Sequence, residues 1–589
     1  MTMTMRKTKI VCTLGPSSNK KEVFKKLVES GLNVARLNFS HGIHEEHKKT
    51  IDIVKEVREE LSLPIAIILD TKGPEIRTGK FKESEYILNE GQRVIVTTED
   101  ILGDNNRFSV SYDGLPGDVI PGNTILIDDG LVELEVLQVL NNTDIECLVK
   151  NSGVIKDRKG VNIPNVKINL PAITKKDIED ILFGIEMNID FIAASFVRKA
   201  SDVLEIRKLL EDNHANHIQI ISKIENQEGV DNVDEIIDVS DGIMVARGDL
   251  GVEIPPEEIP LVQKDIIKKC NRLGKPVITA TQMLDSMMRN PRPTRAEVTD
   301  IANAIFDGTD AIMLSGETAA GKYPVEAVKT MANIALRTES AIDYRELLRN
   351  KIIDKETTVT DAMSYATCST AIDLGASAII TATSSGYTAR MVSKFRPRAP
   401  IIATTAQEAV QRKLSLVWGV NSVLIEELSS TDDVIDKSVE KALQVGYIKR
   451  GELIIITAGV PVGVSGTTNL LKVHIVGDVL LSGVGMGKRA YTGKAIIVDI
   501  DKVDEVEFDH GNILVTQATE KEFMPLIEKA GAIIAEVGGL TSHAAIVGLS
   551  LGIPTVVGAH GATKKLNNGD VITVDSKTGL IYSGKTRVM

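Results

Sequence analysis

The stretch 219-QIISKIE-225 carries the pattern from which the expected architecture follows: a short apolar run ends in charged residues and precedes a segment with helical periodicity. Seven other stretches repeat it: 8-TKIVCTLG-15, 32-LNVARLNFS-40, 65-IAIILD-70, 191-FIAASF-196, 242-GIMVARGD-249, 276-PVITATQ-282 and 311-AIMLSGE-317. Eight strand–helix units predict an α/β fold, a closed (β/α)8 TIM barrel, because parallel strands need crossover helices and eight can close without a free edge. A doubly wound open sheet is the alternative architecture.

The remaining sequence predicts further domains, since 589 residues are too many for one core. Residues 73–170 interrupt the barrel pattern with alternating segments and Gly, Asp and Asn turns. They predict a small inserted β-barrel domain, which acts either as a lid or as a stabilising module. The predicted boundaries are 1–72 and 171–345 for the barrel, 346–476 for an α/β doubly wound domain and 477–589 for an extra C-terminal α/β domain.

Composition argues against several classes of protein. With 68 basic and 81 acidic residues the net charge is −13, so no overall attraction to nucleic acid or to an anionic membrane is expected. No apolar stretch approaches the roughly 18 residues of a membrane span, and residues 1–9 lack a signal-like apolar run. Four cysteines without a CxxC pair indicate neither a disulfide framework nor a zinc site. We therefore expect a soluble cytoplasmic protein.

Charged residues end the predicted strands, where chemistry takes place in a barrel of this kind. Lys223 and Glu225 are two residues apart, so their side chains point the same way, and Asp249 is expected at the end of the next strand. Two carboxylates without His or Cys nearby favour magnesium or manganese over zinc. A Lys–Glu ion pair that only fills the barrel is the alternative for the first two residues.

Two further cations, Arg36 and Arg77, lie on neighbouring predicted loops. Positioned cations and metals stabilise a transferring phosphoryl group, because its transition state spreads negative charge over several oxygens. The turn in 247-RGDLGVEIPPEE-258 offers backbone N–H groups to an anion, and Thr281 offers a hydroxyl on the next strand. No GxxxxGK[ST] loop occurs in the sequence, so any nucleotide is bound without one.

Five stretches resemble those of the pyruvate kinase family: 31-GLNVARLNFSHG-42, 69-LDTKGPEIRTG-79, 220-IISKIENQEG-229, 244-MVARGDLGVEI-254 and 277-VITATQMLDSMMRNPRPTRAE-297. The resemblance covers residues 6–475. It implies a homotetrameric, allosterically regulated phosphotransferase of glycolysis that moves the phosphoryl group of phosphoenolpyruvate to ADP, giving pyruvate and ATP. A phosphohistidine carrier or a phosphoenolpyruvate-sensing regulatory protein is the alternative.

The resemblance implies two kinds of cation site. Glu225 and Asp249 match the ligands of a divalent metal, Mg2+ or Mn2+, that also holds phosphoenolpyruvate. Glu75 matches the carboxylate that accompanies dependence on potassium. The residues that match the K+ site itself are Asn38, Ser40, Asp70 and Thr71.

Substrate contacts also follow from the resemblance. Arg36 matches the residue that grips the phosphate, and Lys223 the one that stabilises the phosphoryl group and the enolate. Thr281, with the backbone amides of Gly248 and Asp249, matches the positions that hold the substrate carboxylate. Thr281 and a water are the first candidates for protonating the enolate, and Ser315 and Glu317 are weaker ones. Nucleotide-side positions are matched by Asn38, His41, Arg77 and Lys176.

Residues 383-TSSGYT-388 resemble the phosphate loop of the family's effector site, with Thr383, Ser384, Ser385, Gly386 and Thr388 as candidate contacts. Ser384 stands where members that respond to fructose 1,6-bisphosphate often carry Lys. The stretch 459-GVPVGVSG-466 lacks the Trp and Arg of their second loop. AMP or another sugar phosphate, such as a pentose phosphate, is therefore as good a candidate effector.

The last predicted domain departs from the basic family plan. Its stretch 541-TSHAAI-546 resembles the mobile phosphohistidine domain of phosphoenolpyruvate-utilising enzymes, and His543 matches the phosphorylated histidine there. A purely structural role for the domain is the alternative. A dikinase-type enzyme would need a nucleotide domain of its own and a barrel placed after the histidine, whereas here the barrel comes first.

Overall fold

The computed structural model describes residues 5–351, 358–428, 430–460, 468–477 and 479–586. The chain forms two compact units. Unit 1 comprises Met1–Lys351, Ala389–Arg396 and Gln407–Leu424, and unit 2 comprises the rest. No helix in the described ranges is both long enough and apolar enough to cross a lipid bilayer.

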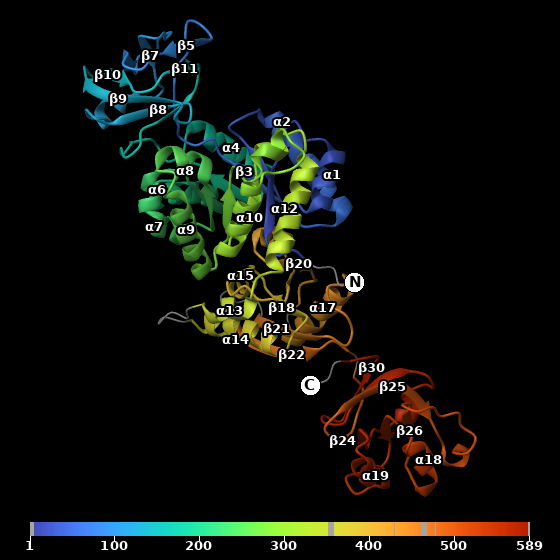
Figure 1. Cartoon of the computed structure of the whole chain (residues 1–589). Helices are drawn as coiled ribbons and strands as arrows, with labels where there is room; N and C mark the ends of the chain where they lie inside the picture. The colour runs from blue at the N-terminus through green and yellow to red at the C-terminus, as the bar shows by residue number, and fades with distance from the viewer. Residues whose placement is uncertain (1–4, 352–357, 429, 461–467, 478, 587–589) are drawn as a thin grey trace. The chain divides into compact units, whose positions relative to one another are not determined.

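Unit 1 contains the predicted closed barrel of eight parallel strands, in the order β1-β17-β16-β15-β14-β13-β3-β2 (Figure 1). The strands are β1 (Lys9–Thr13), β2 (Val34–Asn38), β3 (Ala66–Asp70), β13 (Phe191–Ala194), β14 (Gln219–Ile224), β15 (Gly242–Ala246), β16 (Val277–Ala280) and β17 (Ala311–Leu314). Closure leaves no strand edge unpaired, so the open-sheet alternative does not apply to these residues.

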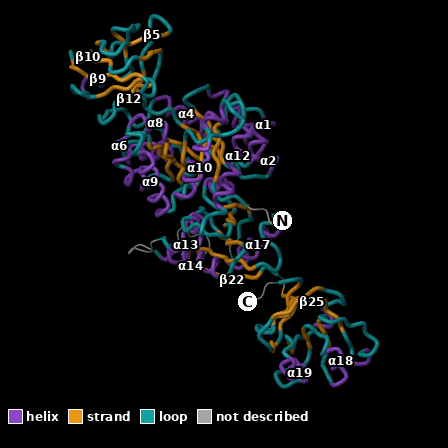
Figure 2. The backbone as a smooth tube through the Cα atoms, viewed as in Figure 1, coloured by secondary structure: helices purple, strands orange, loops and turns teal. Residues whose placement is uncertain are grey.

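Helices surround the strands of the barrel, as Figure 2 shows by colour. The longer helices bury an apolar stripe against the barrel; in α2 the stripe is Ile51, Val54 and Val57. The helices are α1 (Lys21–Ser30), α2 (His44–Leu61), α4 (Lys175–Glu186), α5 (Ala200–Asp212), α6 (Gln227–Asp231), α7 (Val233–Val239), α8 (Arg247–Glu253), α9 (Ile259–Leu273), α10 (Arg295–Asp307), α11 (Gly316–Ala319), α12 (Pro324–Glu339) and α13 (Tyr344–Arg349).

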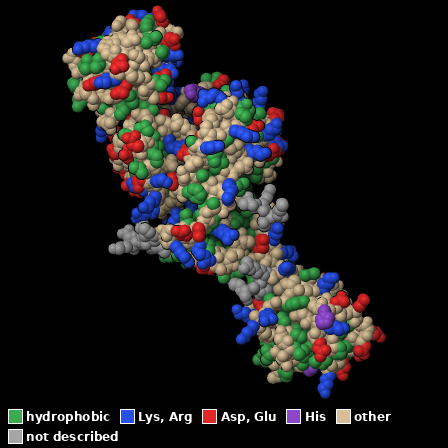
Figure 3. All heavy atoms as spheres, viewed as in Figure 1, with side chains coloured by type: hydrophobic (Ala, Val, Ile, Leu, Met, Phe, Trp, Pro, Cys, Tyr) green, Lys and Arg blue, Asp and Glu red, His purple; other side chains and the backbone are tan. Residues whose placement is uncertain are grey.

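Apolar side chains fill the barrel interior. They include Val34, Ile68, Phe191, Met244 and Met313, all of which are fully or almost fully buried. The barrel is therefore a packed core rather than a pore. Basic and acidic side chains both appear on the visible surface of unit 1 (Figure 3).

The inserted segment of unit 1 is all-β apart from one short helix, as predicted. Its main sheet has the order β4-β12-β8-β9-β10-β6-β7, and β11 pairs with β5. An isolated antiparallel bridge between Thr78 and Val110 joins the two ends of this order, which closes the sheet into a small barrel. The elements are β4 (Ile76–Arg77), β5 (Glu85–Leu88), β6 (Arg93–Thr97), β7 (Arg107–Ser109), α3 (Leu115–Asp118), β8 (Thr124–Ile127), β9 (Val132–Val139), β10 (Asp144–Val149), β11 (Gly153–Lys156) and β12 (Gly160–Asn162).

Unit 2 contains two α/β sheets. In the first, β19, β18 and β21 run parallel and β22 pairs antiparallel with β21. The second has the order β23-β30-β29-β25-β26-β27-β28-β24. The elements are α14 (Val359–Asp373), β18 (Ala378–Ala382), β19 (Ile401–Thr405), α17 (Thr431–Gln444), β21 (Leu453–Gly459), β22 (Thr468–Ile475), β23 (Val479–Ser482), β24 (Val484–Met486), β25 (Ala490–Ile497), β26 (Ile513–Thr516), α18 (Met524–Ile527), β27 (Ala532–Ala535), α19 (His543–Leu551), β28 (Thr555–Val557), α20 (Ala562–Lys565), β29 (Val571–Asp575) and β30 (Leu580–Ser583).

Candidate active site

Lys223 is the centre of a buried charged cluster at the carboxyl ends of three barrel strands. Its Nζ atom lies 2.8 Å from Glu225 Oε1 and 3.2 Å from Asp70 Oδ1, and it donates a hydrogen bond to Ser195 Oγ at 2.8 Å. The three partners lie at the ends of β14, β3 and β13. Because all barrel strands run in parallel, their ends meet on one side, and residues far apart in sequence come together there.

Arg36 joins this cluster from β2. Its Nε donates to Asp70 Oδ2 at 2.6 Å, and its Nη1 donates to Thr13 Oγ1 at 2.8 Å. Asp70 is thus held between two cations, Arg36 and Lys223. The predicted convergence of Arg36 and Lys223 is present, whereas Arg77 lies outside the cluster and pairs with Glu75.

Each charged group of the cluster stabilises the ionised form of its neighbour. Burial raises the pKa of Asp70, but Arg36 and Lys223 outweigh that effect and bring it below its usual range. Burial lowers the pKa of Lys223, yet the carboxylates of Asp70 and Glu225 more than reverse this and leave it above its ordinary value. Lys223 is therefore an ammonium group at neutral pH, at the carboxyl ends of the barrel strands.

Glu225 is a buried carboxylate with two fixed oxygens. Oε1 contacts Lys223, and Oε2 accepts a hydrogen bond of 2.6 Å from the backbone N–H of Phe196. Burial raises the pKa of Glu225 to about 7 against the pull of Lys223, and the charge of Asp249 adds to the rise. The last effect shows that the two carboxylates are close enough to repel each other.

The predicted place of Asp249 at a strand end is wrong. β15 ends at Ala246, and Asp249 lies in the first turn of α8, where it is exposed. The glycine-containing sequence starts a helix directly after the strand, so the carboxylate belongs to the helix rather than to the sheet. It still lies within electrostatic reach of both Glu225 and Lys223.

Glu225 and Asp249 suit a hard divalent cation. Both supply carboxylate oxygens, the ligands that Mg2+ and Mn2+ prefer, and Mg2+ is commonly bound by one or two carboxylates with substrate oxygens and water completing its shell. Among the described residues, no three His, Cys, Asp or Glu side chains gather into a complete metal cage. Two carboxylates leave ligand positions that substrate oxygens and water can fill, so Glu225 and Asp249 fit a metal that is shared with a substrate.

Oxygen atoms of the predicted potassium residues lie on neighbouring strand ends. Asn38 and Asp70 are register partners on β2 and β3, and Asn38 Oδ1 accepts a hydrogen bond from the Ser40 N–H at 3.1 Å. Thr71 Oγ1 lies between the Ala193 carbonyl, at 3.3 Å, and the Ser195 N–H, at 3.1 Å. Such neutral and acidic oxygens suit a hard monovalent cation.

The predicted nucleotide residues fall into two places. The guanidinium of Arg77 contacts both carboxylate oxygens of Glu75, at 2.6 and 2.8 Å, and Lys72 contacts the same carboxylate at 3.1 Å. Lys176 Nζ donates to Phe39 O at 2.8 Å. His41, which is exposed, follows Phe39 by two residues. The His41 N–H donates to Asn38 O at 3.4 Å, so Asn38 lies beside His41.

Thr281 has a strained backbone. Its φ of +68° and that of Gln282, +54°, lie in the left-handed region, which a β-branched residue rarely adopts. The guanidinium of Arg247 holds this conformation by donating to Thr281 O at 2.7 Å and to Ala280 O at 3.2 Å. Strain of this kind is commonly stored at functional sites, and it supports a functional role for Thr281.

Gly248 and Thr281 contact each other directly. The Gly248 N–H donates to Thr281 Oγ1 at 2.8 Å. The expectation of a free N–H at this turn is therefore wrong for Gly248, because the threonine hydroxyl already accepts from it. An anion that binds here would have to share or replace that hydrogen bond.

Glu317 positions the backbone around it. One carboxylate oxygen accepts from the Ser315 N–H at 2.8 Å and the other from the Leu284 N–H at 2.9 Å. The carboxylate is buried and both oxygens are occupied. These contacts suit a structural role better than the proton relay for which Ser315 and Glu317 were weaker candidates.

Ser195 and Phe196 belong to the site although the sequence did not indicate them. Ser195 accepts from Lys223 and donates to Thr71 O at 2.7 Å, so it bridges two predicted site residues. Phe196 has a φ of +55° and orients Glu225 through its N–H. Neither lies in a motif that suggests a site, and only their position after β13 gave a signal.

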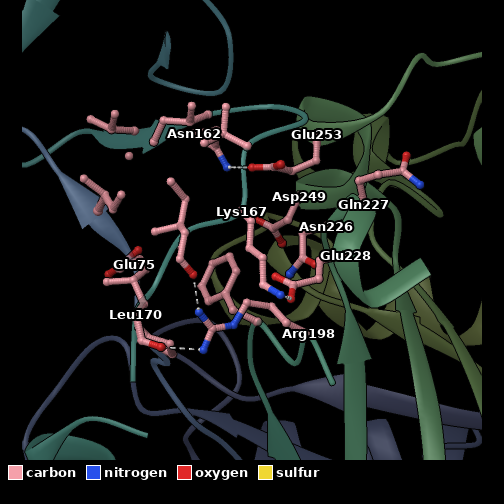
Figure 4. Close-up of a pocket in the computed structure, with 18 of the residues that line it drawn as sticks. Glu75, Asn162, Lys167, Leu170, Arg198, Asn226, Gln227, Glu228, Asp249 and Glu253 are labelled. Atoms are coloured by element: carbon pink, nitrogen blue, oxygen red, sulfur yellow. Dashed lines mark hydrogen bonds and ion pairs between the residues drawn. The ribbon is translucent and has the colours of Figure 1, made fainter. Parts of the chain in front are cut away.

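A cavity of about 660 Å³ adjoins Asp249 within unit 1. Barrel residues line one side of it and residues of the inserted segment the other, and Asn162 Nδ2 donates to Glu253 Oε1 at 2.7 Å across it (Figure 4). Arg77 and Glu75 also line it. Its volume is adequate for a small phosphorylated ligand.

The candidate effector loop follows β18 in unit 2. Gly386 has a φ of +81°, and its N–H donates to Thr383 Oγ1 at 2.9 Å, whereas Ser384 and Ser385 are exposed. Thr388 is buried, and its hydroxyl lies 2.9 Å from that of Thr468. In the second loop of this predicted site, residues 461–467 lie outside the described residues.

His543 is the first residue of α19. Its Nδ1 lies 3.0 Å from Thr519 Oγ1, and Ser542 caps the helix by accepting from the Ala545 N–H at 3.4 Å. The ring is partly exposed.

Family models match three parts of the chain: the pyruvate kinase barrel domain matches residues 5–328, the pyruvate kinase alpha/beta domain residues 361–474, and the mobile domain of PEP-utilising enzymes residues 508–579. A pyruvate kinase of Geobacillus stearothermophilus is 56% identical over 585 residues, which cover 99% of this chain and all of that protein. A pyruvate kinase of Bacillus licheniformis is 56% identical over 586 residues with the same coverage.

A crystal structure of a pyruvate kinase from Cryptosporidium parvum superposes on this fold with a TM-score of 0.76 and 43% sequence identity, and the match covers 80% of this chain and 96% of that one. Sequence and structural likeness therefore agree over the barrel that carries the charged cluster. The chain belongs to the pyruvate kinase family of phosphotransferases.

Proposed function

We propose that the protein is the pyruvate kinase of a glycolytic pathway and transfers the phosphoryl group of phosphoenolpyruvate to ADP at the mouth of the barrel, giving pyruvate and ATP. The observation that carries the proposal is the buried cluster in which Lys223 contacts Glu225 and Asp70 while Arg36 holds the other oxygen of Asp70. A transferring phosphoryl group needs positioned positive charge of this kind.

Glu225 and Asp249 would hold the divalent metal, Mg2+ or Mn2+. When bound, the metal supplies Lewis-acid stabilisation of phosphoryl and enolate oxygens. Lys223 supplies a fixed ammonium beside the phosphoryl group and the enolate oxygen, and Arg36 grips the phosphate. Since these cations are already oriented by Asp70, little reorganisation is needed during the reaction.

The K+ site is proposed at Asn38, Ser40, Asp70 and Thr71, with Glu75 nearby in sequence. Its charge would add to the positive field around the phosphoryl group. The substrate carboxylate is proposed to bind the amides of Gly248 and Asp249 and the hydroxyl of Thr281. Thr281 with a water then delivers the proton to the enolate carbon.

ADP is proposed to bind through Asn38, His41, Arg77 and Lys176, beside the cavity between the barrel and the inserted segment. The segment, residues 73–170, would act as a lid that excludes water from the reaction. The proposed division otherwise assigns residues 1–72 and 171–345 to the barrel, 346–476 to an effector-binding domain and 477–589 to the extra domain.

Regulation is proposed to act through Thr383, Ser384, Ser385, Gly386 and Thr388, with AMP or a sugar phosphate as the effector. The turn of Gly386 exposes hydroxyls that suit a phosphate. We place the protein in the cytoplasm as a homotetramer. The phosphocarrier and sensor alternatives are not favoured, because the relatives that match the whole length, the last domain included, are named pyruvate kinases.

A coupled assay of the purified protein tests the proposal. With phosphoenolpyruvate, ADP, Mg2+ and K+ we expect stoichiometric formation of pyruvate and ATP, no turnover without divalent metal, and a change in the half-saturating phosphoenolpyruvate concentration with AMP or a pentose phosphate. Absence of pyruvate formation by folded wild-type protein under these conditions would refute the proposal. A matched preparation of Lys223→Met excludes a contaminating kinase.

A further inference from the structure

The four residues 195–198, which follow β13, contact the charged cluster and both segments that connect the barrel to the inserted domain. They are Ser195, Phe196, Val197 and Arg198. We call them the 195–198 loop. Ser195, Phe196 and Arg198 make these contacts.

Ser195 contacts Thr71, in the segment after β3 that leads from the barrel to the inserted domain. Its Oγ donates to Thr71 O at 2.7 Å, and its N–H donates to Thr71 Oγ1 at 3.1 Å. The same Oγ accepts from Lys223 at 2.8 Å. Ser195 is therefore fixed on one side to the chain that leaves the barrel and on the other to the proposed catalytic cation.

Phe196 contacts the proposed metal ligand. Its N–H donates to Glu225 Oε2 at 2.6 Å, from a backbone held at a φ of +55°. A residue with a side chain rarely adopts this left-handed conformation. A shift of the loop would therefore move the hydrogen bond that orients the Glu225 carboxylate.

The guanidinium of Arg198 contacts residues 168–171, where the chain returns from the inserted domain to the barrel. We call these residues the returning segment. Nη1 donates to Ile168 O at 3.0 Å, and Nη2 donates to Leu170 O at 2.7 Å and to Pro171 O at 3.1 Å. Figure 4 shows the guanidinium directed at Leu170, beside the cavity. A planar fork with several donors suits such a row of carbonyls, whereas the single ammonium of a lysine does not.

Arg198 is itself held in place from the barrel side. Its N–H donates to Asp202 Oδ2 at 3.0 Å, and its carbonyl accepts from Asn232 Nδ2 at 2.9 Å. Its Nε lies 3.5 Å from the same Asp202 oxygen. The side chain thus connects a rigid part of the barrel to the chain that returns from the inserted segment.

We propose that Arg198 is a positioning residue, which couples the attachment of the inserted domain to the geometry of the Glu225 carboxylate through Phe196. The inference rests on the proposed phosphoryl transfer at this site. The guanidinium contacts to residues 168–171 help to fix the position of Arg198. Only Val197 separates Arg198 from Phe196, so a change in the position of the Arg198 backbone is passed on to the Phe196 N–H.

The test compares Arg198→Met and Arg198→Lys with Arg207→Met. Arg207 lies on α5 and donates to Asp241 Oδ2 at 2.7 Å, so its replacement also removes a partly buried arginine contact but none to the inserted segment. Steady-state kinetics with phosphoenolpyruvate and Mn2+ as the varied ligands, together with thermal unfolding, are measured for each variant.

For Arg198→Met we expect kcat/KM for phosphoenolpyruvate to fall by roughly tenfold or more and the half-saturating Mn2+ concentration to rise by about threefold or more. For Arg198→Lys both constants should lie between those of Arg198→Met and wild type. For Arg207→Met both should stay within about twofold of wild type. If Arg198→Met does not fold, Arg198→Lys decides by the same two constants.

The inference is overturned if the Arg198 variants keep both constants within about twofold of wild type, or if they lose activity only in proportion to the folded fraction with unchanged Mn2+ dependence. Inactivity of the folded wild-type protein would refute the proposed function instead. The two failures are therefore distinguishable.

Discussion

Lys223 Nζ lies 2.8 Å from Glu225 Oε1, so the cation proposed to face the phosphoryl group and a carboxylate proposed to bind the metal form one buried ion pair. Two residues of a single strand end thus supply opposite charges to the same small volume. Replacing either partner changes the other, because a buried charge without its partner is unstable.

Lys223→Met should reduce kcat by roughly 100- to 1,000-fold or more, because it removes a fixed positive charge beside the reacting oxygens at similar side-chain volume. Far-UV circular dichroism should stay as in wild type, since the strands and the apolar side chains that fill the barrel are unchanged. Activity near that of wild type would contradict the assigned role.

Replacing K+ by tetramethylammonium at constant ionic strength should lower kcat by roughly tenfold or more, since the larger ion would not replace K+ at the proposed site of Asn38, Ser40, Asp70 and Thr71. Ser40→Ala should raise the half-saturating K+ concentration. Ser340→Ala, which removes an exposed hydroxyl at the end of α12, is the matched control and should not. Equal rates in both salts would argue against the K+ site.

Thr281→Val removes the hydroxyl at nearly constant volume and should lower kcat by roughly 10- to 100-fold, because the acceptor of the Gly248 N–H and the proposed proton relay are lost together. Thr281→Ser keeps the hydroxyl and should retain most activity. The control is Thr279→Val in β16, which removes a hydroxyl that donates to Thr309 Oγ1 at 3.0 Å. It should leave kcat within about twofold of wild type. Similar kcat values for the two valine variants would contradict the role of Thr281.

The strand pattern was sufficient to predict the eight strands of the barrel, since each is a short apolar run with a polar end and local periodicity determines it. It was insufficient for Asp249, because a helix that starts directly after Ala246 reads like a strand end in sequence. Ser195 and Phe196 were missed for another reason. Their contacts join positions 28 to 124 residues apart, which local sequence does not encode.

Lys9 should make stability depend on pH. Its Nζ donates to Val420 O at 2.6 Å, and burial, helped by the charge of Arg6, lowers its pKa to about 7 against the opposing pull of Glu339 and Asp310. Between pH 7 and the ordinary value of 10.5, the unfolded chain binds a proton that the folded chain lacks, so stability rises with pH in this window.

The measurement for Lys9 is the difference in thermal midpoint between wild type and Lys9→Met, taken at one scan rate. The midpoint of wild type should rise relative to that of Lys9→Met from pH 7 to pH 9. The corresponding difference in free energy of unfolding should grow by up to about 1.4 kcal/mol per pH unit. Subtracting the variant removes the contributions of all other titrating groups. A difference that is constant or falls with pH would contradict the prediction.

The most direct test of the account is a titration with Mn2+, followed by electron paramagnetic resonance, with and without phosphoenolpyruvate. We predict one Mn2+ per chain, which binds more tightly when phosphoenolpyruvate is present. Glu225→Gln and Asp249→Asn should each bind Mn2+ at least about tenfold more weakly. Glu253→Gln, which removes a carboxylate from the cavity that Asp249 also lines, should change the affinity by less than about twofold. Binding of Mn2+ that is unchanged in both Glu225→Gln and Asp249→Asn would contradict the shared site for metal and phosphate ester.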